Sequence, residues 1–282
     1  MTPPLSRRKL LAMGSVAVGS AAITAAIANA DPRGATASSG GRIFIVGDST
    51  AAIYPTSAAP RAGWGQALPA FVADGIEIVD RAQPGASSKS YADAGLLDAA
   101  LREIDEGDWM LISFGHNDQR INVPDRYAAP YSTYQRYLTG YIERSRARGA
   151  FPVLLTSVER RSFWGGRARP TLGEYPEAML ALAEETGTAV IDLHALSLAR
   201  WEQLGEEATK SRFMWVPPGH PNYPAGIADD THFQARGAIE VARMVARAAA
   251  DQGILPAAYW GDLDREVTEE EIEWPEELPD LL

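Results

Sequence analysis

The sequence predicts an α/β fold in which a parallel β-sheet is covered by helices on both faces. Apolar runs of four to six residues, rich in Ile, Val, Leu or Phe, alternate along the chain with amphipathic stretches. Continuous apolar runs of this length are typical of strands that are buried on both faces. Strands that alternate with helices in this way are joined by right-handed crossovers.

The expected strands are the five apolar runs at 42–46, 76–79, 109–114, 151–155 and 189–193. The amphipathic stretches predict helices at 64–72, 91–104, 133–148, 175–185 and 235–250. Two further segments, 163–173 and 215–228, are rich in Gly, Pro and aromatic residues and are expected to be long loops. In an open parallel sheet, loops beyond the carboxyl ends of the strands line the ligand crevice.

The first thirty residues have the pattern of an export signal. Ser6-Arg7-Arg8-Lys9 is a twin-arginine pattern, an apolar run follows at 12–27, and Ala28-Asn29-Ala30 is a small-x-small cleavage site. The apolar run is too short to span a bilayer comfortably. We therefore expect a twin-arginine signal peptide at 1–30, a linker at 31–41 and a secreted protein without stable membrane association. An uncleaved membrane anchor is the alternative.

Composition narrows the classes of partner. The 282 residues suffice for one sizeable domain, placed at 42–255, followed by an extension at 256–282. Removal of 1–30 would change the net charge from −11 to 23 − 37 = −14, since that segment holds three bases and no acids. An acidic chain without a basic patch argues against nucleic acid and against an anionic membrane surface. The absence of cysteine excludes disulfides, thiolate metal sites and cysteine nucleophiles.

The extension is strongly acidic, with ten acidic residues and one basic residue from Asp262 onward. Such a composition is typical of a solvated tail. Its apolar residues, Trp274, Leu278, Leu281 and Leu282, leave docking on the domain or on a partner as the alternative.

Ser49 is the candidate nucleophile. It follows the first apolar run directly, in Gly47-Asp48-Ser49-Thr50. A serine in a strand-to-helix turn presents its hydroxyl at the carboxyl edge of the sheet, where backbone N–H groups and the positive helix end stabilise an oxyanion. The segment alone is also typical of a helix N-cap, because Asp and Ser are common capping residues.

His232 is the candidate base among four histidines, at 116, 194, 220 and 232. It stands three residues after Asp229, a spacing that allows the carboxylate to meet Nδ1 and leaves Nε2 to accept the serine proton. Asp230 is interpreted as a loop or capping residue. No second histidine or carboxylate falls at ligand spacing near this cluster, which argues against a metal.

Two further residues could supply donors to a tetrahedral oxyanion. Gly85 follows the second predicted strand and, without a side chain, lets its N–H approach a substrate closely. Asn117 follows the third and offers a side-chain amide. A turn glycine and an Asx-turn residue are the simpler interpretations. His116 is interpreted as a residue that fixes this turn.

Taken together, these segments resemble the SGNH (GDSL-type) hydrolase superfamily, and the residues around them resemble its rhamnogalacturonan acetylesterase-like branch. The resemblance runs from about Arg42 to Arg247. Its extended matches lie at 47–50, 63–65, 85 with 87–91, 114–118, and 230–233 with 237–238.

The resemblance implies a three-layer α/β/α, flavodoxin-like fold with a five-stranded parallel sheet, and neither cofactor nor metal. It implies Ser49 as nucleophile and His232 as base, oriented by Asp229. The N–H groups of Ser49 and Gly85 and the Asn117 side chain would form the oxyanion hole. The implied reaction removes acetyl groups from a polysaccharide, either pectic rhamnogalacturonan or related cell-wall material.

The expected partner is therefore an acetylated polysaccharide or oligosaccharide. Aromatic residues could stack on its sugar rings, although each is also compatible with packing in the core or a loop. The candidates are Trp64, Trp164, Trp215 and Tyr223. The alternatives on the same fold are a lipase or thioesterase that acts on longer acyl chains, and a catalytically inactive carbohydrate-binding protein.

Overall fold

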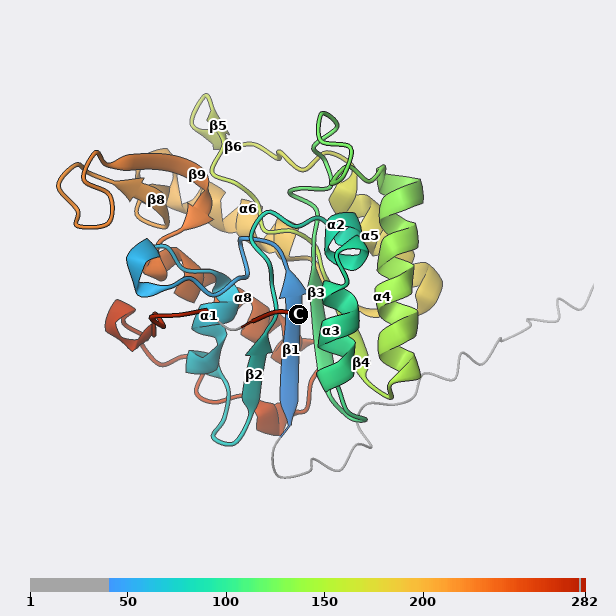
Figure 1. Ribbon diagram of the computed structural model, residues 1–282. Helices are drawn as coiled ribbons and strands as arrows, with labels where there is room; N and C mark the ends of the chain where they lie inside the picture. The colour runs from blue at the N-terminus through green and yellow to red at the C-terminus, as the bar shows by residue number, and fades with distance from the viewer. Residues whose placement is uncertain (1–40, 279) are drawn as a thin grey trace, which may run out of the picture. The chain divides into compact units, whose positions relative to one another are not determined.

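Five parallel strands form the main sheet, in the order β2-β1-β3-β4-β7 (Figure 1). The computed structural model describes residues 41–278 and 280–282, so the predicted signal peptide at 1–30 and nearly all of the linker at 31–41 lie outside the described residues. The strands are β1 Arg42–Gly47, β2 Glu77–Asp80, β3 Trp109–Ser113, β4 Phe151–Leu155 and β7 Ala189–Ile191. This order confirms the predicted five-stranded, flavodoxin-like sheet.

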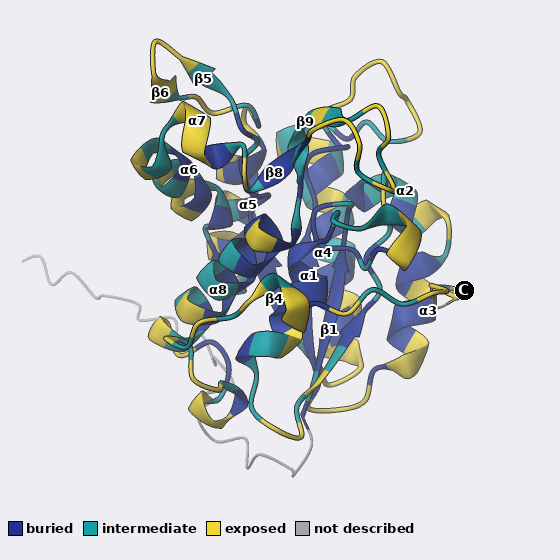
Figure 2. Ribbon diagram, turned by 90° about the vertical axis from the view of Figure 1, so that its left-hand side faces the viewer, coloured by how far each residue is buried: buried dark blue, intermediate teal, exposed yellow. Residues whose placement is uncertain are grey.

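Helices cover both faces of the sheet, and each face has its own apolar cluster. Along β1, Ile43 and Ile45 point into one cluster while Phe44 and Val46 point into the other, because successive side chains of a strand alternate. The first cluster is covered by α1 Trp64–Ala67, α6 Leu193–Leu204 and α8 Ala235–Asp251. The second is covered by α2 Ser88–Asp93, α3 Leu96–Glu103, α4 Gln135–Ala147 and α5 Tyr175–Thr186. Figure 2 shows the buried strands between these layers.

Three predicted helices are interrupted by local chemistry. The one at 91–104 is two helices, α2 and α3, separated at Gly95, whose φ of 80° is a conformation that glycine adopts without strain. The one at 64–72 is α1 followed by the 3₁₀ turn η3 Leu68–Phe71, with Pro69 near the start of that turn. The one at 133–148 begins in a π-helical turn, η4 Pro130–Tyr134, before α4. None of the described helices is both long and apolar enough to cross a membrane.

Elements beyond the predicted ones lie between β4 and α8. The expected loop at 163–173 contains a hairpin of β5 Phe163–Trp164 and β6 Arg167–Ala168. Helices α6 and α7 Glu206–Thr209 follow β7. The prediction of a loop over 215–228 is wrong at both ends, because β8 Phe213–Val216 and β9 Ile227–Phe233 form an antiparallel pair on either side of it. Only 217–226 connects the two strands.

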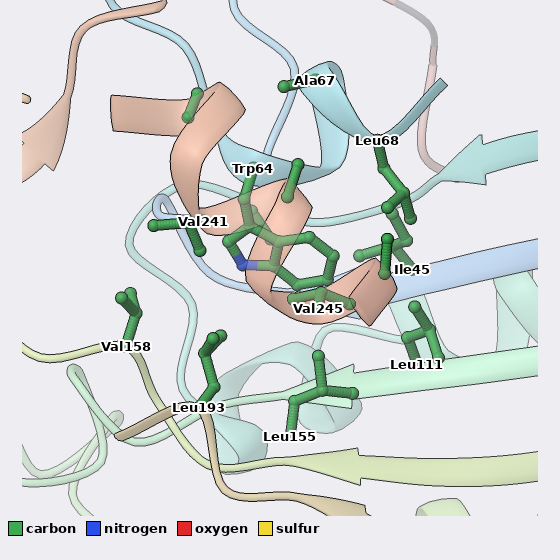
Figure 3. Close-up of a cluster of buried hydrophobic side chains, with 14 of the residues drawn as sticks. Ile45, Trp64, Ala67, Leu68, Leu111, Leu155, Val158, Leu193, Val241 and Val245 are labelled. Atoms are coloured by element: carbon green, nitrogen blue, oxygen red, sulfur yellow. The ribbon is translucent and has the colours of Figure 1, made fainter. Parts of the chain in front are cut away.

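Trp64 lies in the core, between the sheet and α8. Its side chain has no exposed surface and lies among Ile45, Val241 and Val245 (Figure 3). The expectation that Trp64 stacks on a sugar ring is therefore wrong. Burying so large an apolar ring between a short helix and α8 is instead a major contribution to packing of this layer.

The C-terminal extension is docked on the domain, so the interpretation as a solvated tail is wrong for this part of the chain. It contains two 3₁₀ turns, η5 Ala257–Tyr259 and η6 Glu269–Glu271. Ile272 is buried in the first apolar cluster. The Trp274 Nε1–H donates to the Arg61 carbonyl at 2.9 Å, and the Thr56 N–H donates to the Pro275 carbonyl at 2.9 Å. These bonds fasten the extension to the segment between β1 and α1.

Asp80, at the end of β2, is a buried carboxyl group. One oxygen accepts a hydrogen bond from the Ala82 N–H at 2.8 Å, and the other has no hydrogen-bond partner among the described residues. Burial raises the pKa of Asp80 to about 8, against the opposing effect of the Ala82 N–H. The folded protein therefore holds a proton here at neutral pH.

Replacement of Asp80 by Asn tests this protonation. The folded pKa is raised, so the native state binds a proton that the unfolded chain releases near pH 4, and the free energy of unfolding falls as pH rises from about 4 to 8. Asp80→Asn keeps the shape and removes the titration. We expect its Tm to exceed that of the wild type by about 2–8 °C at pH 8 and by clearly less at pH 5, measured by circular dichroism. The control is exposed Asp74→Asn; an equal gain at both pH values for Asp80→Asn would contradict the prediction.

Candidate active site

Ser49 lies in a tight turn at the carboxyl end of β1. The N–H groups of Ala51 and Ala52 both donate to the Asp48 carbonyl, at 3.1 and 3.2 Å. Asp48 itself is buried, and its Oδ1 accepts from the N–H and hydroxyl of Thr50 at 2.9 and 2.8 Å. The expected helix directly after Ser49 is absent, since the next α-helix, α1, begins at Trp64. A helix dipole therefore does not act on Ser49 from this turn.

His116 holds the same turn from the third strand. Its Nδ1 lies 3.2 Å from Asp48 Oδ2 and its Nε2 lies 2.9 Å from the Val158 carbonyl oxygen. Burial disfavours the charge on Asp48, but His116 and the Thr50 donors outweigh it and lower the pKa of Asp48. Both ring nitrogens of His116 are engaged inside the protein, as expected for a residue that fixes the turn.

His232 reaches Ser49 from the opposite end of the chain. Its Nε2 lies 2.9 Å from Ser49 Oγ, and its Nδ1 lies 2.7 Å from Asp229 Oδ2. Phe213 pairs with Phe233 and Met214 pairs with Asp229, so three residues of β9 bulge out of the ladder between these pairs. A bulge of this kind redirects side chains next to functional sites. It folds His232 back over the carboxylate of Asp229.

The carboxylate of Asp229 is held in its charged form. Its Oδ1 accepts from the N–H groups of Thr231 and His232 at 2.8 and 3.1 Å. Burial raises the pKa, but the His232 ring and these backbone donors outweigh it and bring the pKa of Asp229 down to about 2. Arg61 Nη2 adds a positive charge 3.7 Å from Oδ2.

Arg61 was not predicted, and the sequence around it carries no motif that could identify it. Its guanidinium lies 5.6 Å from the ring centre of Tyr54, whose hydroxyl donates to the Ser49 carbonyl at 2.7 Å. The position of Arg61 follows from tertiary contacts, above all the bond from Trp274 in the C-terminal extension to its carbonyl.

The three predicted oxyanion donors lie at the ends of the first three strands of the chain. Neither the Ser49 N–H nor the Gly85 N–H donates a hydrogen bond to any residue that the structure describes. Gly85 has φ of 80°, which favours glycine. Asn117 is buried and uses one amide hydrogen to bond the Ala86 carbonyl at 2.9 Å, so the second hydrogen remains. Asn117 is thereby joined to the Gly85 turn.

Asp230 lies in strand β9, so its interpretation as a loop or capping residue is wrong, but its side chain has structural contacts only. Its Oδ1 accepts from Arg161 Nη1 at 2.9 Å and from Trp215 Nε1 at 2.8 Å. Trp215 is thus engaged by Asp230, and Arg161 and Lys210 lie 5.0 and 4.7 Å from its ring centre. The Tyr223 hydroxyl donates to the Ala58 carbonyl at 2.9 Å. Trp215 packs within β8 and Tyr223 within the 217–226 connection, and neither has a contact that marks it as a sugar platform.

Asp118, beside Asn117, is a further buried carboxyl group whose position was not predicted. Asp118 accepts hydrogen bonds from the N–H and hydroxyl of Ser88. Burial raises the pKa of Asp118 to about 7, against these bonds from Ser88. Within the described part of the chain, no group of three or more His, Cys, Asp or Glu side chains is arranged to hold a metal ion.

A serine hydroxyl bonded to a carboxylate-oriented imidazole, at the carboxyl edge of a flavodoxin-like sheet, can carry out acyl transfer. The fold and this arrangement define the chain as a carboxylic ester hydrolase. More specifically, it belongs to the GDSL-like Lipase/Acylhydrolase family, whose model matches residues 45–238.

Individual relatives agree with this placement. The chain is 45% identical to the rhamnogalacturonan acetylesterase RhgT of Bacillus subtilis over 76% of its own length and 91% of the relative's. It is 38% identical to a second B. subtilis protein, named "Probable rhamnogalacturonan acetylesterase YesY", over 75% and 94%. The crystal structure of B. subtilis YxiM superposes with a TM-score of 0.67 at 28% identity, covering 76% of this chain and 57% of that one. The predicted resemblance to the rhamnogalacturonan acetylesterase-like branch is confirmed.

Neighbouring aspartates in β9 allow a matched test of the geometry. Asp229→Asn removes the charge that orients His232, and we expect kcat for p-nitrophenyl acetate to fall on the order of 10³- to 10⁴-fold. Asp230→Asn removes one charge at the adjacent position, where only Arg161 and Trp215 are contacted, and we expect a change of less than about fivefold. Similar losses of kcat in the two variants would contradict the prediction, because they would show that activity depends on the total charge of β9 and not on the contact between Asp229 and His232.

Proposed function

We propose that the chain is an exported serine esterase that removes O-acetyl groups from a polysaccharide, either pectic rhamnogalacturonan or a related cell-wall glycan. The observation that carries this proposal is the 2.9 Å contact between Ser49 Oγ and His232 Nε2, with Asp229 on the other ring nitrogen. The names of the two B. subtilis relatives support acetyl groups on rhamnogalacturonan as the substrate.

The first half of the reaction acylates Ser49. His232 Nε2 accepts the hydroxyl proton while Oγ attacks the acetyl carbonyl carbon, and the carbonyl π electrons move to oxygen. The resulting imidazolium is stabilised by Asp229, which remains a carboxylate because its pKa is about 2. Collapse of the tetrahedral intermediate expels the sugar oxygen, which takes the proton from His232.

The second half repeats these steps with water. His232 removes a proton from water, the oxygen attacks the acetyl carbonyl of the acyl-enzyme, and Ser49 Oγ leaves with the proton returned by the imidazolium. The products are the free enzyme and acetic acid, which releases its proton to solvent to give acetate. In both halves the oxyanion lies against the unbonded N–H groups of Ser49 and Gly85 and the remaining amide hydrogen of Asn117.

The β5–β6 hairpin provides an aromatic surface beside this site. Trp164 is 76% exposed, in contrast to buried Trp64. The Arg161 N–H, next to the hairpin, donates to the Asp230 carbonyl at 2.8 Å and so ties it to the strand that carries His232. Figure 1 shows the hairpin rising beyond the same edge of the sheet as β9. An exposed indole there is suited to stacking on a sugar ring.

Export rests on the sequence pattern at 1–30, with its twin arginines and small-x-small site. A polysaccharide of a cell wall is encountered outside the cytoplasm, so export and substrate are mutually consistent. Fractionation of the expressing cell, with Arg7 and Arg8 replaced together by Lys as the comparison, tests this part independently of activity.

Acetate release tests the reaction and its substrate. The wild type should release acetate from acetylated pectins faster than from acetylated xylan, and should hydrolyse p-nitrophenyl acetate far faster than the octanoate. Ser49→Ala should lose at least about 10⁴-fold in each assay, because nothing else can form the acyl-enzyme. Preference for the octanoate would indicate a lipase or thioesterase. A wild type that hydrolyses none of these esters would indicate an inactive binding protein.

Trp164→Ala tests the aromatic surface. Loss of one stacking contact should raise KM for the acetylated polymer about three- to tenfold, with little change in kcat. The KM for p-nitrophenyl acetate should change by less than about twofold, because this small ester has no sugar ring that could stack on Trp164. An increase for both substrates would place Trp164 in the fold of the site and not in polymer binding.

A further inference from the structure

Arg126 lies against the Gly85 turn, and its guanidinium forms no ion pair with any residue that the structure describes. A Cβ atom added to Gly85 would lie 3.3 Å from Arg126 Nη2 and 3.6 Å from its Cζ. The guanidinium is therefore stacked close to a residue that we assign to the oxyanion hole. It is partly buried, and no described residue forms an ion pair or accepts a side-chain hydrogen bond from it.

Three other arginines at this edge of the sheet have partners within the protein. Arg61 faces Asp229 at 3.7 Å, and Arg161 bonds Asp230 at 2.9 Å. Arg160 donates to the Thr171 hydroxyl at 3.1 Å. Each of these has a structural explanation within the protein. Arg126 has no such partner among the described residues. An unpaired guanidinium next to a glycine turn contributes little to the stability of the fold.

The buried carboxylates that follow β1 and β3 are committed elsewhere. Asp118 is bonded to Ser88, and Asp48 is bonded to His116 and Thr50. Asp125, the sequence neighbour of Arg126, is exposed and forms no ion pair with it among the described residues. A positive charge thus remains at the site of a chain whose net charge is −11.

The backbone around Arg126 is fixed. Its N–H donates to the Val123 carbonyl at 2.9 Å, and Lys89 Nζ donates to the Pro124 carbonyl at 2.9 Å. Two residues further on, the Ala128 N–H donates to the Asp118 carbonyl and its own carbonyl accepts from the Tyr175 hydroxyl. The guanidinium is therefore presented from a segment tied down on both sides, so that little ordering is needed when it binds a ligand.

We propose that Arg126 binds the carboxylate of a uronate residue in the substrate, and so selects acidic over neutral acetylated polysaccharides. The proposal rests on the proposed function, because it assumes that the acetyl ester lies over Gly85. A guanidinium matches the two oxygens of a carboxylate with parallel N–H donors. The contact between Arg126 and the uronate would then determine which acetylated sugar of the polymer lies at Ser49.

The experiment compares three substrates that share the acetyl ester. They are O-acetylated rhamnogalacturonan, the same polymer with its carboxylates methyl-esterified, and p-nitrophenyl acetate. Arg126→Gln should lower kcat/KM about tenfold on the acidic polymer, the loss expected for one hydrogen-bonded charge contact. On the other two substrates it should change kcat/KM by less than about twofold, since neither presents a carboxylate.

Two further variants make the test independent of side-chain size. On the acidic polymer, kcat/KM should fall in the order wild type, Arg126→Lys, Arg126→Gln, Arg126→Glu, and added salt should reduce the differences. Exposed Arg102→Gln is the control for net charge, with no expected effect. Thermal unfolding of each variant verifies that it is folded.

Equal losses of kcat/KM on all three substrates would overturn the proposal, because they would show that Arg126 acts in acyl transfer or in folding. An order of kcat/KM on the acidic polymer that does not follow the charge at position 126 would also overturn it. It is also overturned by unchanged kinetics of Arg126→Gln. A wild type that hydrolyses p-nitrophenyl acetate but releases no acetate from either polymer rejects the proposed polysaccharide function itself, whatever the variants do.

Discussion

The contact between Ser49 Oγ and His232 Nε2 joins residues 183 positions apart, and much of the architecture serves to fix its two ends. Ser49 is set by the main sheet, whose first strand ends two residues earlier. His232 is not in that sheet at all but in the bulge of β9. That strand is secured by Phe233, which packs with Phe213 and Trp201, and by the bond from the Ala62 N–H to the Phe233 carbonyl. A contact of 2.9 Å requires both anchors to be rigid.

The site contains two Asp–His pairs that differ in how far they are buried. Asp48 and His116 are almost entirely inaccessible and lock the turn under Ser49, whereas Asp229 and His232 are partly exposed and face the substrate side. Isolated buried charges are costly, so Asp48 is paired with His116 and bonded to Thr50. The more exposed pair keeps access to solvent, as the proton transfers proposed for His232 require. The buried Asp48–His116 pair is thus structural, whereas the more exposed Asp229–His232 pair is the one that we propose to react.

Strands β1, β3 and β4 of the main sheet could be predicted to within one residue because each is an apolar run that is almost entirely buried. The helices were less predictable where a single residue overrides periodicity, as Gly95 does between α2 and α3. Ser49, Gly85, Asn117 and the Asp229/His232 spacing carry local signatures, and the structure brings Ser49, His232 and Asp229 together. The prediction that Trp64 binds sugar was wrong because the exposure of a side chain depends on tertiary packing. The same Gly-Trp-Gly could border a cleft or, as here, place the ring under α8. Arg61 and the β8–β9 pairing likewise depend on contacts that no local pattern encodes.

The C-terminal extension shows how misleading charge can be as a guide to exposure. Its acidic residues face outward, yet what positions it is apolar and main-chain chemistry: Ile272 in the core and hydrogen bonds to the 56–66 segment. Trp274 caps the carbonyl of Arg61, and Arg61 in turn faces the carboxylate that orients His232. Trp274 of the extension is therefore three contacts away from the candidate base, through Arg61 and Asp229. Because the bond from Trp274 is made to the Arg61 backbone, the extension helps to position Arg61 beside Asp229 even though no acidic side chain of the extension contacts the site.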